Sequence, residues 1–355
     1  MATATATATA TAINSIFSES NNKLYVENKP CNEIVHNRDK FLINSNILFN
    51  DLKREYQEIY FNDKSYDSQF EKLSDKEKYF YLEGKYATNC IDEKNSLTEV
   101  NQISRALNSA QSKNNYPTDS LRDLFDEVKQ SITSGKNDYL DVLKNIFSNY
   151  MEFVKELREI LSELSKSVKA GSKDGYINID VNDLLNKLLA LRTKAERPGF
   201  FSIWMYFSKD DDGRYYREIN GEKIYYQNNI EADNAVRAVE KLLNEIKGVT
   251  SKKEDNSASV RPDIDFLFSV NIDLSGVDKL INYLNGMPQG SHDILQTEFD
   301  LLKKTLDAIE KGINTNLDEL SKKYSSANSN YDNFVKIVSS TMNTLLEMAK
   351  GFLRF

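Results

Sequence analysis

The chain has 355 residues, of which 40% are hydrophobic and 28% are charged, and its formal net charge is −8. A chain of this length can bury one or two sizeable cores, while an acidic balance without any basic block excludes a general nucleic-acid binder. With only two cysteines and two histidines, we expect no metal cluster, no other cofactor and no disulfide framework, although a single bridge between Cys31 and Cys90 stays open.

Residues 1–40 are predicted to be a disordered export leader. The stretch "MATATATATATAINSIFSES" (1–20) is uncharged and low in complexity, and no Lys or Arg precedes Lys23. Such a composition cannot bury enough apolar surface to fold, and it lacks the basic and apolar regions of an ordinary secretory signal peptide. No apolar run in the chain reaches the roughly 18 residues that a membrane span needs.

Residues 41–118 are predicted to form an N-terminal helical hairpin. Apolar residues recur at helical spacing over 48–59 and over 97–107, and the Tyr-rich, charged stretch 60–86 is assigned to helix as well. The turn sequence "NNYPTD" (114–119) separates this unit from the next one.

Two long helices, 119–170 and 291–355, are predicted to pair as an antiparallel central coiled coil. Apolar residues recur every three or four positions from 121 to 168 and from 302 to 352. Neither helix can bury such a stripe alone, so each needs the other. Ser120 with Asp123 resembles a capping box for the first helix, and Ser291 with Asp293 is the predicted start of the second.

Residues 171–290 are predicted to form a distal mixed α/β domain inserted between the long helices, so the fold class is mainly α. Period-two alternation predicts strands at 176–181 and 264–272, and the Asn220-Gly221 pair predicts a hairpin within a three-stranded aromatic meander. The other expected parts of this domain are helices after each alternating strand, a helix over 231–247 and a loop over 250–262.

Motifs for catalysis are missing from the sequence. It has no GxSxG, P-loop or HExxH pattern. The stretch "DDDG" (210–213) lacks carboxylates at the first and last positions of a calcium loop, and "SKDGYINIDVND" (172–183) fails in the same way. We therefore expect a protein that is not an enzyme and holds no metal.

The C-terminal stretch "KKYSSANSNYDNFVKIVSSTM" (322–342) resembles the signature of the type III secretion needle-tip proteins, the IpaD/SipD/BipD family of invasins. A second similarity covers 171–188, and 123–150 fits the family's first long helix. The matching signature positions are Lys323, Tyr324, Ser325, Ala327, Asn328, Ser329, Asp332, Asn333, Val335, Lys336, Ser339, Ser340 and Thr341.

This resemblance implies a secreted virulence protein at the bacterial surface, exported by the type III apparatus to the needle tip. The family caps the needle, regulates secretion, senses bile salts and forms the platform for the translocon in host-cell invasion. Its implied partners are the needle subunit, translocator proteins, further copies in a tip ring, bile salts and, indirectly, the host membrane. The family's N-terminal hairpin acts as a built-in chaperone.

Two sets of candidate site residues follow. For needle and tip assembly they are Tyr324, Asn328, Asp332, Asn333, Lys336, Ser339 and Ser340, of which Asp332 and Lys336 form a favourable i, i+4 pair. For a ligand they are Trp204, Phe201 and Tyr206. The simpler interpretations are a solvated helix face for the first set and the core of the meander for the second. A coiled-coil surface adhesin and a membrane-inserting translocator are the alternative functions.

Overall fold

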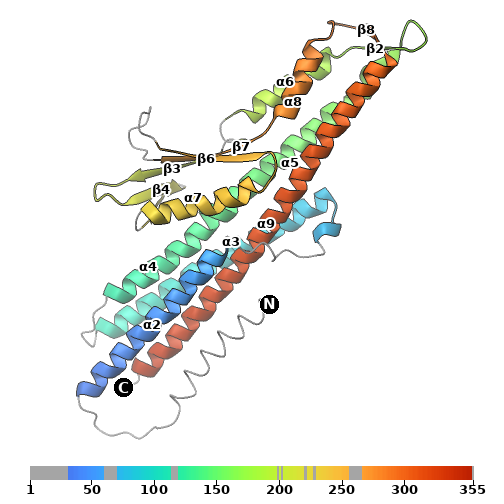
Figure 1. The fold of residues 1–355 in the computed structure, drawn as a ribbon. Helices are drawn as coiled ribbons and strands as arrows, with labels where there is room; N and C mark the ends of the chain where they lie inside the picture. The colour runs from blue at the N-terminus through green and yellow to red at the C-terminus, as the bar shows by residue number, and fades with distance from the viewer. Residues whose placement is uncertain are drawn as a thin grey trace.

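The structure is a computed structural model that describes residues 31–59, 70–112, 119–197, 200, 203–219, 222–226, 229–255 and 266–353. It is mainly α, with a mixed α/β part inserted between two long helices, as the sequence predicted. Figure 1 shows the long helices side by side and antiparallel, with two further helices at the end near the C-terminus, the larger group of strands beside their middle and a smaller group at the other end. Within these ranges no helix is both apolar enough and long enough to cross a bilayer.

The first long helix is continuous but not uniform. It consists of α4 (Asp119–Ser134), a π-helical segment η2 (Gly135–Leu140) and α5 (Asp141–Ser162). Its predicted end near residue 170 is wrong, because η3 (Glu163–Ser167) and β1 (Val168–Ala170) follow α5. These residues leave the helix to pair with β2 (Tyr176–Ile179).

The second long helix, α9 (Gln296–Leu353), has 58 residues and extends for about 87 Å at the helical rise. The predicted start at Ser291 is wrong. Residues His292–Leu295 form β8, which completes a small sheet of order β1-β2-β8. Asp293 accepts hydrogen bonds from Ser172 and from Asn178 across this sheet, so its side chain does not cap the helix.

The hairpin helices α2 (Cys31–Ile59) and α3 (Asp75–Ser112), the second preceded by the short η1 (Phe70–Lys72), each pack against both α4 and α9. The four helices therefore form a bundle at the end near the C-terminus (Figure 1). Residues 31–40, assigned to the leader from sequence, belong to α2. The rest of the leader, 1–30, lies outside the described residues.

The aromatic meander forms part of a five-stranded antiparallel sheet of order β5-β4-β3-β7-β6. The predicted loop at 250–262 is wrong in its first half, because residues up to Asp255 form β6. This strand pairs with β7 at the edge of the sheet, where charged side chains such as Lys252 and Lys253 are tolerated and hide the strand pattern. The strands are β3 (Ile203–Lys209), β4 (Tyr215–Ile219), β5 (Glu222–Tyr226), β6 (Val249–Asp255) and β7 (Phe266–Ile272).

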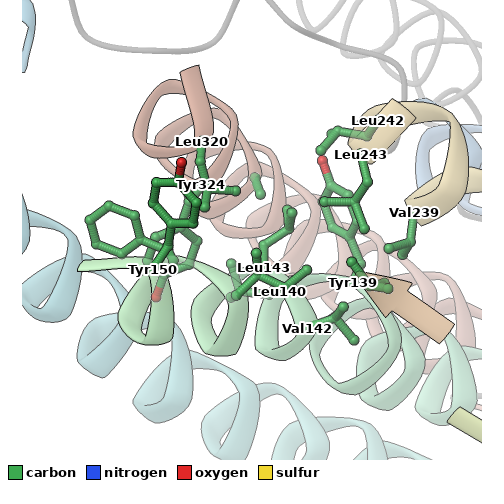
Figure 2. Close-up of a cluster of buried hydrophobic side chains, with 14 of the residues drawn as sticks. Tyr139, Leu140, Val142, Leu143, Tyr150, Val239, Leu242, Leu243, Leu320 and Tyr324 are labelled. Carbon is green, nitrogen blue, oxygen red and sulfur yellow. The ribbon is translucent and has the colours of Figure 1, made fainter. Parts of the chain in front are cut away.

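Three further helices connect the strands to the long pair. They are α6 (Asn182–Ala195), α7 (Asn229–Asn244) and α8 (Ser275–Asn285). Figure 2 shows Tyr139 and Leu143 of the first long helix in one apolar cluster with Leu243 of α7 and with Leu320 and Tyr324 of α9. The distal part and the long helices therefore share one core.

Candidate interaction surface on the C-terminal helix

The apolar stripe of α9 is core, as its spacing predicted. Tyr331, Val338, Met342 and Leu345 have no exposed surface. This stripe packs between the first long helix and the hairpin, so it fixes how α9 is rotated in the bundle. The rotation in turn decides which of the candidate polar residues reach solvent.

Three candidate residues, Asn333, Lys336 and Ser340, lie on the exposed side of α9. The Lys336 side chain is 68% exposed, and its Nζ lies 2.7 Å from Asp332 Oδ2 in the predicted i, i+4 pair. Asp332 itself is half-buried. An exposed pair of this kind adds only about 0.3–0.5 kcal/mol to a helix, so stability does not require a charge at position 336.

Tyr324, Asn328 and Ser339 are covered by α3 or by the core, which the spacing of the candidate set did not indicate. Tyr324 is 0% exposed and Asn328 is 1% exposed. Asn89 of α3 donates to the Asn328 carbonyl oxygen at 3.1 Å and to its Oδ1 at 2.9 Å. In this structure, therefore, these residues contact their own chain, because a helical repeat shows which residues share a face but not which helix covers it.

The inward side of α3 places polar residues against the long helices over its central part. We call Tyr86, Asn89, Glu93 and Ser96 the polar seam. The Tyr86 hydroxyl donates to Asp141 Oδ1 at 2.8 Å, and the hydroxyls of Ser96 and Ser339 lie 3.3 Å apart.

A lysine of η2 joins the polar seam to the first long helix. Lys136 Nζ lies 3.0 Å from Asp141 Oδ2 and 3.8 Å from Glu93 Oε2. Burial raises the pKa of Glu93, and the Lys136 charge only partly opposes this effect. Glu93 is therefore held by a long and incompletely compensated ion pair.

A second polar contact attaches the five-stranded sheet to the first long helix at the same π-helical segment. The Asp138 carboxylate is 0% exposed; it pairs with Arg217 of β4 and accepts a hydrogen bond of 2.6 Å from the Tyr226 hydroxyl of β5. Burial raises the pKa of Asp138 even though both partners favour its charged form. π-Helical turns are uncommon and are often associated with functional sites.

Of the three predicted ligand residues, only Tyr206 has a side chain that the structure describes. Phe201 and the side chain of Trp204 lie outside the described residues, and Tyr206 is half-buried on β3. Elsewhere, a groove of about 460 Å³ runs along the contact between α5 and α6. Its apolar lining comes from Ile160, Ala190 and Leu191, its cationic lining from Lys187, Lys194 and Arg197, and its acidic lining from Glu156, Glu159 and Glu163.

Sequence reasoning missed the residues of α3 and η2 that contact the candidate site. For α3 a signal was present: positions 82, 86, 89, 93, 96, 100 and 103 follow a heptad-like spacing, with polar residues in the middle. For Asp138 no local signal exists, because its partners are 79 and 88 residues away.

Comparison with known proteins identifies what the chain is similar to. The family profile for type III secretion systems tip complex components matches residues 56–353. Among curated proteins, the chain is 27% identical to the cell invasion protein SipD of Salmonella typhi over 236 residues, covering 65% of this chain and 61% of that protein. It is 24% identical to the invasin IpaD of Shigella flexneri over 238 residues, covering 66% and 61% respectively.

Solved structures give similar matches at lower identity. BipD of Burkholderia pseudomallei aligns with a TM-score of 0.44 at 14% identity, covering 75% of this chain and 78% of that one. A Pathogenicity island 1 effector protein from Chromobacterium violaceum aligns with a TM-score of 0.41 at 18% identity, covering 86% and 99%. The chain thus spans a little under two thirds of the length of the curated relatives it matches.

Proposed function

This chain belongs to the family of type III secretion systems tip complex components, and from that membership we propose that it caps the secretion needle and regulates secretion during host-cell invasion. The observation that carries the proposal is the extent of the family match, which includes α3, both long helices and the distal part. In this proposal the protein is a structural component of the apparatus, acts at the bacterial surface after export, and contacts needle subunits, translocator proteins and further copies of itself.

Docking on the needle or on a neighbouring copy is assigned to the exposed side of α9 around Asn333, Lys336 and Ser340. These residues are solvated in the single chain and contribute little to its stability. At an interface, a charge facing a complementary patch can contribute several kcal/mol. Substitutions on the exposed side of α9 should therefore leave the stability of the fold unchanged, whereas they should weaken binding to the needle or to a neighbouring copy.

The hairpin is proposed to shield the seam-facing side of α9 before assembly. Asn89 and Ser96 of α3 form hydrogen bonds with Asn328 and Ser339, two residues of the C-terminal signature. A chain lacking residues 41–116 would expose this surface together with the apolar stripe beside it. We expect such a chain to self-associate, and sedimentation showing an unchanged monomer would contradict shielding.

Bile salt sensing is proposed for the groove between α5 and α6. A bile salt is an amphipathic anion, and the groove combines the apolar Ile160 with the cationic Arg197, while its two lysines pair with Glu156 and Glu163. Calorimetric titration with deoxycholate should show binding that Arg197→Gln weakens and that the exposed control Arg237→Gln on α7 leaves unchanged. Equal binding by both variants would place the ligand elsewhere, including the Trp204 face, which a change in Trp204 fluorescence would detect.

The proposed function is tested by deleting the gene for this chain and measuring translocator secretion, needle assembly and host-cell invasion. We expect needles to persist while secretion becomes unregulated and invasion is lost, and the full chain supplied from a plasmid should restore both. Normal invasion by the deletion strain would refute the proposal, and loss of the needles themselves would indicate a role in building the needle rather than capping it.

A further inference from the structure

We propose that the two hairpin helices have separate roles: α3 is built to leave the bundle on its own, while α2 remains as a permanent part of it. This inference rests on the proposed shielding role of the hairpin and goes beyond it, because shielding alone would be satisfied by a hairpin that moves as one unit. The basis for the separation is the difference in how each helix is attached to α4 and α9.

Helix α2 is attached by large apolar side chains. Phe41, Phe49 and Leu52 are buried. The Phe49 ring meets Phe125 of α4 edge-on at 5.9 Å. Two turns further along the same side of α2, the ring of Tyr56 lies 5.4 Å from that of Phe334 of α9. Removing α2 would expose aromatic surface on three helices at once, which the hydrophobic effect strongly opposes.

Helix α3 is attached differently along its length. Its buried apolar residues lie at the two ends of the contact, Leu82 at one end and Val100 with Ile103 at the other. Between Leu82 and Val100 the helix advances about 27 Å. Over that distance the nearly fully buried residues are Asn89 and Ser96, while Tyr86 and Leu97 are partly buried against the core.

Polar contacts of this kind fix alignment more than they add affinity. A buried asparagine in a coiled coil sets the register and the choice of partner at a cost in stability. When α3 leaves, water can replace its hydrogen bonds to Asn328 and Ser339, and the charges of Lys136 and Asp141 regain hydration. The polar seam therefore selects α3 as the occupant of this site and also lowers the cost of removing it.

The surface uncovered by α3 defines the chemistry of a replacement partner. Asn328 offers a carbonyl oxygen and an amide oxygen as acceptors, and Ser339 offers a hydroxyl. A helix that fits must present an amide where Asn89 now lies and a small hydroxyl seven residues later, where Ser96 lies. The partner class is thus a helix with polar residues at heptad spacing, not a purely apolar helix.

Native-state hydrogen exchange on the full chain tests this inference. We expect the amides of α3 around the polar seam to exchange through an opening that leaves α2 protected, with α2 exchanging only together with α4 and α9. Asn89→Ala should speed exchange in α3 about tenfold and leave α2 unchanged. Ser45→Ala is the matched control: Ser45 is buried on α2 but bonds only to the carbonyl of Phe41 in its own helix, so exchange should not change in either helix.

Joint exchange of α2 and α3 would overturn the inference, and so would an α3 that exchanges as slowly as α2. Even then shielding by a hairpin that moves as one unit would remain possible, and the self-association of the chain lacking 41–116 tests that separately.

A reversible crosslink gives a second measurement on one polypeptide. The Ser96 and Ser339 hydroxyls lie 3.3 Å apart, so Ser96→Cys with Ser339→Cys, in a chain with Cys31→Ser and Cys90→Ser, should form a disulfide that holds α3 in place. The oxidised chain should lose the independent exchange of α3, and reduction should restore it. Exchange of α3 that is the same before and after reduction would refute release at the polar seam.

Discussion

Helix α3 and the five-stranded sheet are attached to the same six-residue π-helical segment by similar chemistry, yet the two attachments differ in how closely the charged groups are paired. Asp138, toward the sheet, is fully enclosed and satisfied by Arg217 and Tyr226. Lys136, two residues earlier, faces α3 and is also largely buried, but it reaches Glu93 only at 3.8 Å. Removing one partner of a close, hydrogen-bonded buried pair costs several kcal/mol, whereas a long contact has less to lose. The closeness of the partners therefore separates a permanent attachment from a reversible one.

The largest expected effect is at the permanent attachment. Asp138→Ala leaves the Arg217 guanidinium, which is only 15% exposed, without its carboxylate, and breaking a buried pair from one side costs about 3–5 kcal/mol. Denaturant unfolding should show a loss of that size. The control Asp212→Ala, at an exposed aspartate in the turn between β3 and β4, should cost less than about 0.5 kcal/mol. A loss below about 1 kcal/mol for Asp138→Ala would remove the distinction drawn between the two attachments.

The next effect has the opposite sign. Replacing both members of the Asn89 and Asn328 pair by Leu exchanges a buried polar contact for an apolar one, which is often neutral or stabilising by about 1–4 kcal/mol. We expect α3 to become more protected in hydrogen exchange and the chain to assemble less readily on purified needles. Stronger α3 attachment with unchanged needle assembly would show that α3 does not have to leave.

A smaller effect concerns pH. The folded-state pKa of Glu93 is raised by burial, so this residue favours the attached state fully below its unfolded value of about 4.3, and that contribution is lost as pH rises through the folded pKa. Comparing α3 exchange in the unmodified chain and in Glu93→Gln between pH 4 and 7 isolates this contribution from those of Glu83, Asp141, Lys136 and Lys144, which also face the seam. The difference in α3 exchange between the unmodified chain and Glu93→Gln should shrink as pH falls. A difference that stays constant with pH would contradict this role of Glu93.

The smallest expected effect on stability is at Lys336, on the exposed side of α9. Lys336→Glu should leave the melting temperature nearly unchanged, because only an exposed pair is lost, but should abolish tip assembly and secretion control. Val338→Asp is the opposite control: it buries an unpaired charge at a 0% exposed position and should cost several kcal/mol. Normal invasion by a strain that carries Lys336→Glu would show that this side of α9 is solvated surface and not a docking site.

The predictable parts of this fold were those encoded by short-range periodicity. The stripes along the two long helices predicted their antiparallel pairing, and the Asn220-Gly221 turn predicted the connection of β4 to β5. Strand β6 was missed because an edge strand keeps charged residues that a buried strand would not. The ends of the long helices were misplaced because Asp293 and its neighbours gain more from pairing with β2 than from capping α9.

The candidate site was predicted only in part, for a related reason. The candidate set taken from the C-terminal signature includes Asn333, Lys336 and Ser340, which lie on the exposed side of α9. Sequence spacing could not show that α3 lies over Asn328 and Ser339. Contacts between residues far apart in sequence have no local signal. Asp138 illustrates the same point, since only the folded sheet brings Arg217 to it.

The sequence separation between Asn89 and Asn328, 239 residues, has a consequence for the order of events in the proposed export, in which the chain emerges from a narrow conduit. If the N-terminus leads, α2 and α3 appear long before α9, and the seam has nothing to close on until nearly the whole chain has passed. Loop closure over such a distance is slow compared with helix formation. The last helix to emerge is therefore the one that completes the bundle, and during that interval α3 is available to any other helix within reach.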